Sequence, residues 1–185
     1  MLNIQSQTWA NTKAEFGGRF LPAGGHKCVI KNVEQKMSKS GKPMLAIAFD
    51  ISGGEFDGYY MDLFGRNVEK AQKEGKQAKW PNGGVIYQLI DDEHLGRFKG
   101  VIENIEKSNA GFKFAMEEKA LIGKFFGGVF REEEYEAQDG SIKTAVRCNA
   151  IREVEGIEDI PVPQKKCLTN KPQDNNPMGN VEIPF

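Results

Sequence analysis

The chain has 185 residues, of which 39% are apolar and 28% are charged, a composition typical of a globular domain in water. It contains no apolar run long enough to span a membrane, and its first residues lack the basic start and apolar core of a secretory signal. We therefore expect a cytoplasmic protein. The net charge of −1 argues against a simple polycation that coats nucleic acid.

Charge is unevenly distributed along the chain. Residues 27–42 hold five lysines and one glutamate, and residues 66–79 hold five basic and two acidic residues. Residues 131–139, in contrast, hold one arginine and five acidic residues. The chain is neutral because these segments cancel, so the distribution of charge is more informative than its sum.

The first regular elements are two β-strands, at 26–35 and 44–51, joined by a lysine-rich turn. The second strand alternates, and the side chains expected to face the core are Leu45, Ile47, Phe49 and Ile51. The opposite face carries Met44, Ala46, Ala48 and Asp50. Its small alanines either leave room for a ligand or belong to an ordinary solvated face of the sheet.

The middle of the chain is less regular. We predict a third strand at 59–64 and a mobile polar insertion at 65–90, with a short helix at 66–74. A longer helix follows, because apolar residues recur at spacings of three and four positions: Leu95, Phe98, Ile102 and Ile105. This is the strongest helical signal in the sequence.

Two further strands are predicted at 123–135 and 141–154. The pair Gly127-Gly128 in the first of them indicates a bulge or a sharp bend, as a barrel corner requires. Three strands, a helix and a two-stranded hairpin are the element order of an OB-fold, a five-stranded Greek-key barrel with one helix between strands three and four. Small mixed α+β domains can share this order.

We therefore predict a mainly β protein whose OB-fold domain covers residues 1–155. The aromatic rings assigned to its core are Phe49, Phe98, Phe125 and Phe130. Residues 156–185 are rich in proline and poor in β-branched and aromatic residues, which is typical of a flexible tail. The segment 157–168 can still pack on the domain through its apolar residues, Ile157, Ile160 and Val162.

No motif for catalysis is present. The chain lacks a P-loop, a nucleophile elbow and a histidine-based triad. Its three cysteines are far apart and its two histidines lack metal-ligand spacing. Four acidic residues lie close together in the sequence and could hold Mg²⁺ or Ca²⁺: Asp50, Glu55, Asp57 and Asp62. They lack the spacing of an EF-hand, so we favour the interpretation that they belong to a solvated turn. We predict no enzymatic activity and no cofactor.

Binding of single-stranded nucleic acid requires cations that follow the phosphates and aromatic faces on which bases stack. The predicted DNA-binding residues are Lys31, Lys36, Lys39, Lys42, Tyr59, Tyr60, Trp80, Lys143 and Arg147. The acidic run at 131–136 is expected at the start of the loop between strands four and five. A bound strand would avoid that side, or those carboxylates would face a neighbouring subunit.

These segments together resemble a family of bacteriophage and prophage single-stranded DNA-binding proteins with an SSB-like OB-fold. The resemblance rests on "HKCVIKNVEQKMSKSGKPMLAIAFDI", "GEFDGYY", "FKGVIENIEKSN" through "ALIGKFFGGVFREEEY", and "VEIPF". It covers roughly residues 17–165 and the last few residues. It implies a protein that coats single-stranded DNA without sequence preference during phage DNA replication and recombination, and that forms a homodimer or homotetramer.

The final residues also resemble the C-terminus of bacterial single-stranded DNA-binding proteins (SSB), where a tail ends in aspartates followed by Ile-Pro-Phe. The resemblance implies a docking site for replication, recombination and repair proteins at Glu182, Ile183, Pro184 and Phe185. Phe185 can fill an apolar pocket while its terminal carboxylate pairs with a basic rim. The acidic run is thinner here, because only Glu182 adjoins the apolar residues.

Two other functions are compatible with the sequence. One is an interaction module that does not bind DNA and uses its SSB-like tip to compete for host partners. The other, less favoured, is a metal-dependent nuclease that uses Asp50, Glu55, Asp57 and Asp62.

Overall fold

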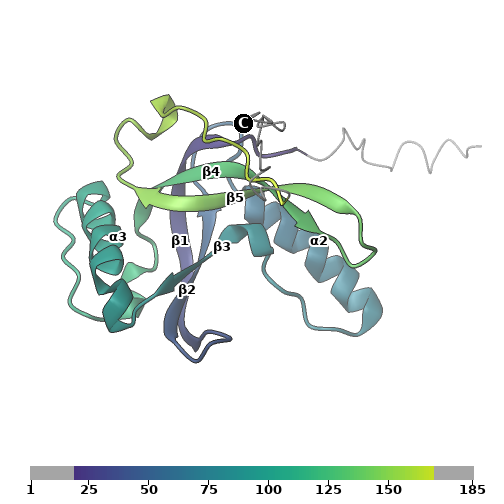
Figure 1. Ribbon diagram of the computed structural model, residues 1–185, viewed down its shortest axis with the longest axis horizontal. Coiled ribbons are helices and arrows are strands. Elements are labelled where there is room, and N and C mark those ends of the chain that lie inside the picture. The colour runs from purple at the N-terminus through teal and green to yellow at the C-terminus, as the bar shows by residue number, and fades with distance from the viewer. Residues whose placement is uncertain (1–18, 169–185) are drawn as a thin grey trace, which may run out of the picture.

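A five-stranded antiparallel sheet and two α-helices make up the part of the chain that the computed structural model describes, residues 19–168 (Figure 1). The strands are β1 (Gly24–Met37), β2 (Pro43–Ile51), β3 (Val85–Leu89), β4 (Phe125–Glu136) and β5 (Ile142–Arg152). The helices are α2 (Tyr59–Glu74) and α3 (Leu95–Ser108). The order across the sheet is β3-β2-β1-β4-β5, so β1 is central and β3 and β5 are the edges. Neither helix is long and apolar enough to span a membrane.

Four predicted strands and the helix that begins at Leu95 are confirmed. The strand predicted at 59–64 is wrong, because these residues form the first turns of α2. Tyr60, Leu63 and Phe64 recur at the spacing of a helix face, and the run of aromatic residues concealed this period. The third strand is instead β3, which lies inside the segment predicted to be a mobile insertion.

The sheet is curved around one hydrophobic core but is not closed. Inward side chains from the five strands pack into a single cluster. At its centre the ring of Phe49 makes edge-to-face contacts with Tyr60, Phe126 and Phe130, at centroid distances of 5.4, 5.5 and 6.0 Å. Phe49 and Phe130 are therefore core residues as predicted. The prediction for Phe125 is wrong by one position, because Phe126 points inward and Phe125 outward.

The predicted closed barrel is wrong as well. Within residues 19–168, β3 and β5 share no hydrogen-bonded ladder, and the seam between them stays open. The turn Asn82–Gly84 leads into β3 and lies against β5, where a Cβ on Gly83 would be 3.7 Å from the carbonyl oxygen of Val146. This turn occupies the place in which a closing ladder would begin, and β3 is only five residues long.

A β-bulge at Lys31 reverses the alternation of β1. Ile30 pairs with Phe49 and Asn32 with Ala48, so Lys31 is the extra residue. Before the bulge the odd-numbered side chains point outward, and after it the even-numbered ones do. Val33 is consequently buried in the core, while Lys27 and Lys36 both lie on the outer face of the sheet.

Gly127 and Gly128 allow the closest backbone approach in β4. A Cβ on Gly127 would be 2.4 Å from the carbonyl oxygen of Glu153, and a Cβ on Gly128 would be 2.6 Å from the ring of Phe130. A register shift follows, between Val129 and Phe130, but its extra residue is Asn149 of β5 and not one of the two glycines.

Residues 156–168 lie along the sheet. Ile157 is buried, as expected, whereas Val162 is 64% exposed. Further on, the amide of Lys166 donates to the carbonyl of Glu132 (2.9 Å), and the amide of Glu134 donates to the carbonyl of Lys166 (2.8 Å). This parallel bridge covers the side of β4 that β1 does not reach. The remainder of the predicted tail lies outside the described residues.

The start of α2 is held by a buried carboxylate from β2. Asp50 is 2% exposed and is the only buried charged residue among residues 19–168. Its Oδ1 accepts hydrogen bonds from the amides of Tyr60 (2.8 Å) and Ile51 (2.9 Å), and its Oδ2 accepts one from Met61 (3.3 Å). Asp50 thus satisfies two free N–H groups of the first turn and complements the positive end of the helix dipole.

We expect the Asp50→Ala variant to lose about 3 kcal/mol of unfolding free energy in urea, because two helix amides lose a charged acceptor in a buried site. Asp57→Ala is the matched control: it removes one hydrogen bond, to the amide of Gly53, from an exposed turn. Its loss should stay below about 1 kcal/mol. Equal losses in the two variants would contradict the role given to Asp50.

Candidate nucleic-acid interface

The open seam forms a cleft on one side of the molecule. A cavity of about 490 Å³ is lined by Val85–Tyr87 of β3 and by Arg147–Asn149 of β5. In Figure 1 these two strands cross in front of the central strand β1. A second cavity toward α3 is lined by Arg97 and Arg152 and shares Tyr87 with the first, and a third toward α2 is lined by Tyr59 and shares Gly83 with it. The same seam therefore connects both helices.

Tyr87 is the aromatic side chain best placed for stacking in this cleft. It is 60% exposed and points outward from β3, directly opposite Ala46 of β2. Ala46 is only 7% exposed, whereas most of the Tyr87 side chain is accessible to solvent. Sequence reasoning missed Tyr87, although the run "VIYQL" has the β-branched and aromatic residues typical of a strand.

The three aromatic residues predicted from the sequence differ in exposure. The prediction that Tyr60 stacks on bases is wrong, because this residue is 3% exposed and packs on Phe49 in the core. Burial raises the pKa of its phenol well above the ordinary value. Tyr59 is half-buried at the α2 side of the cleft. Trp80 is half-buried against Phe64, and its Nε1 donates to the carbonyl of Gly84 (3.0 Å).

Four predicted lysines lie on β1 and the turn that follows it. Lys31 and Lys39 are exposed and have no ion-pair partner within residues 19–168. Lys36 lies 2.9 Å from a carboxylate oxygen of Glu34, and this neighbour is the main cause of its raised pKa. Lys36 pairs with Met44, and Met44 pairs with Leu89 of β3, so Lys36 lies on the same face of the sheet as Tyr87, two strands away from it.

Lys42 is the least available of the four. Its Nζ contacts Asp91 at 3.0 Å and also pairs with Glu93. Burial alone would raise the pKa of Asp91, but hydrogen bonds from Lys42 and His94 outweigh burial and lower it. Asp91, Glu93 and His94 have metal-ligand spacing, yet the Lys42 ammonium already occupies this group by pairing with both carboxylates.

Both predicted cations of β5 point outward, as expected. Lys143 is exposed and lies 3.6 Å from Asp139 in the β4–β5 turn. Arg147 lines the cleft and lies 5.8 Å from the centre of the Tyr135 ring. Arg147 makes no salt bridge in the described part of the chain, so its guanidinium is available to an anionic ligand.

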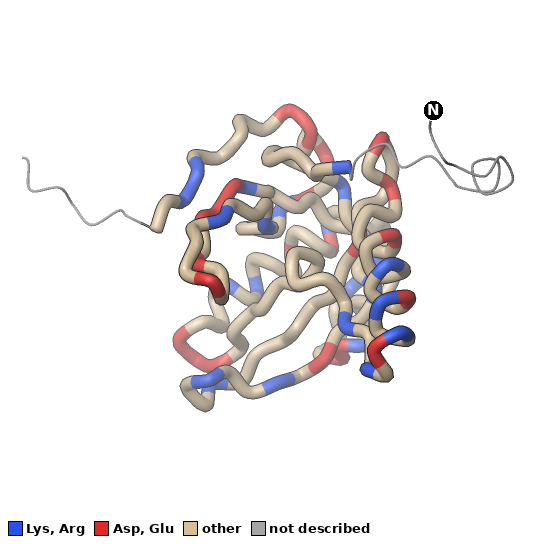
Figure 2. The backbone as a smooth tube through the Cα atoms, turned by 90° about the vertical axis from the view of Figure 1, so that its right-hand side faces the viewer, with Lys and Arg blue, Asp and Glu red and all other residues tan. Residues whose placement is uncertain are grey.

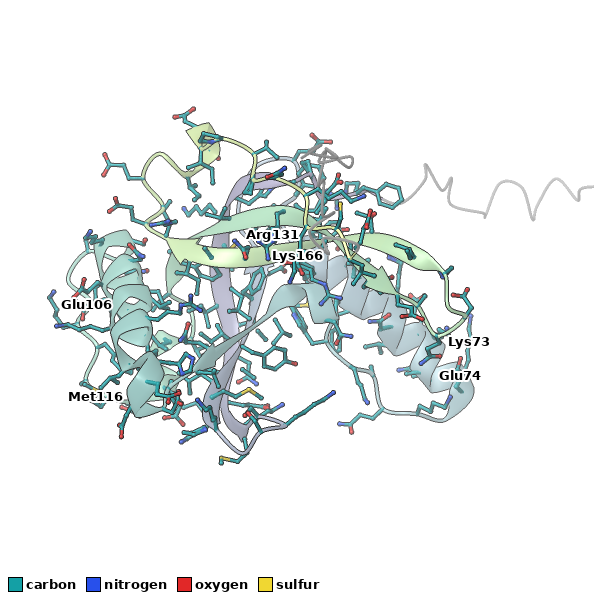
Figure 3. All side chains as sticks on the ribbon, in the orientation of Figure 1. Lys73, Glu74, Glu106, Met116, Arg131 and Lys166 are labelled. Carbon is teal, nitrogen blue, oxygen red and sulfur yellow. The ribbon has the colours of Figure 1, made fainter. Side chains whose placement is uncertain are left out.

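The acidic run lies within β4 and not in the following loop. Its carboxylates alternate between the two faces of the strand, so they do not form one uniform patch. Arg131 contacts Glu133 at 2.6 Å, and Lys165 contacts Glu134 at 2.9 Å. Lys165 is also the main cause of the lowered pKa of Glu134. Figure 3 labels Arg131 and Lys166 in this region, where residues 165–168 run beside β4.

The carboxylates considered for a nuclease do not converge on a metal site. Asp50 accepts hydrogen bonds from the first amides of α2, and Asp57 accepts one from the amide of Gly53. Asp62 forms a salt bridge with Arg19 at 2.6 Å. Among the described residues they form no group with metal-ligand spacing. The geometry therefore does not support the nuclease hypothesis.

The predicted partner-binding residues 182–185 lie outside the described residues. Comparison with known proteins adds no assignment, because no protein-family model and no curated protein sequence matches the chain.

We expect Tyr87→Ala to weaken binding to oligo-dT about tenfold or more in fluorescence anisotropy, because a stacked base contributes about 1–3 kcal/mol. Tyr87→Phe should retain the affinity, since the ring remains. Tyr60→Phe should also bind like the unaltered chain, because Tyr60 is buried. An affinity that Tyr87→Ala leaves unchanged would remove Tyr87 from the binding site.

Proposed function

We propose that the chain binds single-stranded DNA without sequence preference, across the outer face of β2 and β3 and the cleft between β3 and β5. The observation that carries the proposal is the exposed ring of Tyr87 in a cleft that Arg147 also lines, with Lys36 on the same face of the sheet. A ring that accepts any base and cations that accept phosphates are the two requirements for binding a single strand.

The same arrangement favours a single strand over a duplex. Bases can stack on a tyrosine ring only when their own faces are free, and in a duplex they are covered by neighbouring bases. Arg147 and the lysines of the β1–β2 turn would contact phosphates, which carry no sequence information. Pairing of Glu133 and Glu134 with basic neighbours lowers the repulsion that the acidic run would otherwise exert.

The strand order and the position of α3 also support this proposal. The strand order and the position of α3 between β3 and β4 match an OB-fold in which the ladder between the third and fifth strands has not formed. OB-folds bind oligonucleotides on the face of strands two and three, which here carries Ala46, Ala48 and Tyr87. We therefore propose an open OB-fold with α2 as an additional helix.

The resemblance noted in the sequence supplies the biological setting of the proposal. A phage single-stranded DNA-binding protein would coat exposed strands during replication and recombination and would self-associate. Its partners would dock on Glu182, Ile183, Pro184 and Phe185.

The first test is fluorescence anisotropy of labelled oligo-dT and of a duplex, at low and moderate salt. We expect binding to the single strand that weakens as salt rises, and a much lower affinity for the duplex. Absence of binding to oligo-dT at low salt would overturn the proposal, and the non-DNA interaction module would then become the preferred function.

Deletion of residues 181–185 tests the second part of the proposal. The truncated chain should bind oligo-dT as well as the full chain or more tightly, because the deletion removes a carboxylate and leaves the cleft unchanged. It should no longer retain replication and repair proteins from a host extract that the full chain retains. Weaker DNA binding after the deletion would contradict this division of roles.

A further inference from the structure

A second basic and aromatic surface lies on the outer side of β1. We call it the back patch and define it by Lys27, Lys124, Phe112 and Phe125. The Nζ of Lys27 lies 4.4 Å from the centre of the Phe125 ring, and the Nζ of Lys124 lies 4.6 Å from the centre of the Phe112 ring. Neither lysine has a salt-bridge partner within residues 19–168.

The back patch faces away from the cleft. Phe125 pairs with Val29 on the outer face of the sheet, and the amide of Ile30 donates to the carbonyl of Lys124 (2.9 Å). Lys27 is part of the central strand β1, and Lys124 is hydrogen-bonded to that strand through its carbonyl. The cleft, in contrast, lies between the two edge strands. Because the sheet curves around one core, the centre and the seam lie on opposite sides.

A row of lysines connects the two surfaces. Along β1 and its turn it consists of Lys27, Lys31, Lys36 and Lys39. The bulge at Lys31 is essential to this row, since without it Lys36 would point toward the core side. From Lys27 to Lys36 the strand extends about 30 Å, at about 3.3 Å per residue. At Lys36 the row shares the outer face with Tyr87, because Lys36 pairs with Met44 and Met44 pairs with Leu89, two residues from Tyr87.

Within β1 and the turn that follows it, the row has a single acidic residue. Glu34 is the only acidic residue between positions 27 and 39, and Lys36 lies 2.9 Å from it. Lys119 also lowers the pKa of Glu34, after the larger effect of Lys36, and its Nζ donates to the carbonyl of Val33 (2.6 Å). A phosphate chain that follows β1 would therefore meet cations whose acidic neighbour is already neutralised.

The two ring contacts suit the recognition of phosphates. Each ring holds a lysine side chain in place, which reduces the conformational entropy lost when a phosphate binds. An ammonium group covers one face of each ring, so the back patch offers anion binding and no free stacking platform. Its contacts would be independent of base sequence.

We propose that a single strand held in the cleft continues past Tyr87 and Lys36, follows β1, and ends on Lys27 and Lys124. One chain would then hold a strand on two opposite faces. This inference rests on the proposed function. It adds the back patch as a second protein surface that binds phosphates of the same strand.

The test compares two lengths of oligo-dT: about 8 nucleotides, which lies within the site size of a single OB-fold, and about 30 nucleotides, which exceeds it. DNA is kept in excess so that each strand binds one protein. The variant is the double substitution Lys27→Gln and Lys124→Gln. We expect the slope of log affinity against log salt for the longer strand to fall by about 1.4, or about 0.7 per lost phosphate contact. The slope for the shorter strand should not change.

A matched control is the double substitution Lys70→Gln and Lys73→Gln on α2. It removes the same charge from exposed residues, on a helix where basic and acidic residues alternate (Figure 2), and Lys73 lies near its far end (Figure 3). This control should keep the slope of the unaltered chain for both strands. The substitutions Lys27→Arg and Lys124→Arg should also keep it, because they retain the charge.

An unchanged slope for the longer strand in the glutamine variant would overturn the inference and leave the proposed function intact. An equal fall in the α2 control would overturn it too, since the effect would then be one of total charge. Failure of the unaltered chain to bind either strand would instead show that the proposed function itself is wrong.

Discussion

The buried carboxylate of Asp50 determines where α2 begins, and much of the molecule follows from that point. Burial of a charge is costly, and here the cost is offset by three backbone amides and by the positive end of the helix. With α2 anchored at the end of β2, Tyr60 enters the core beside Phe49. The chain that leaves α2 then returns through the turn Asn82–Gly84. This turn lies against β5 and separates it from β3, so the seam that we propose as the binding cleft depends on the same anchor.

An open seam normally exposes two strand edges to unwanted pairing. In this protein the edges are short or irregular: β3 has five residues, and Asn149 is an extra residue in β5, between Cys148 and Ala150. The charged guanidinium of Arg147 and the large ring of Tyr87 also flank the opening. The features that discourage another strand of protein are the same ones that we expect a strand of DNA to use.

Charge distribution in the folded chain differs from the distribution along the sequence. The acidic run of β4 is divided between two faces, and two of its carboxylates are paired with Arg131 and Lys165. Lys42 is engaged with Asp91 and Glu93, whereas Lys31 and Lys39 are free of such pairs in the described part of the chain. A nearly neutral protein can therefore present basic surfaces, because most of its acidic side chains near those surfaces already have basic neighbours.

Local patterns were sufficient to predict four strands, the helix at Leu95 and the outward direction of Lys143 and Arg147. Such patterns depend on neighbouring residues, and period-2 and period-3.6 alternation can be recognised without the fold. Exposure of the candidate rings could not be predicted in this way. Tyr60 is buried because Asp50, ten positions away in the sequence, fixes the start of α2, and Tyr87 is exposed because it points outward from the edge strand β3.

Closure of the sheet, the pairing of charges and the position of the back patch were likewise decided only by the tertiary structure. Each depends on residues far apart in the chain, such as Val146 beside Gly83 or Lys27 over Phe125. The sequence by itself determined which segments are strands or helix and which residue types are available for binding. Folding decided which of those residues share a surface, because shared surfaces are created by long-range contacts that leave no periodic signal in the sequence.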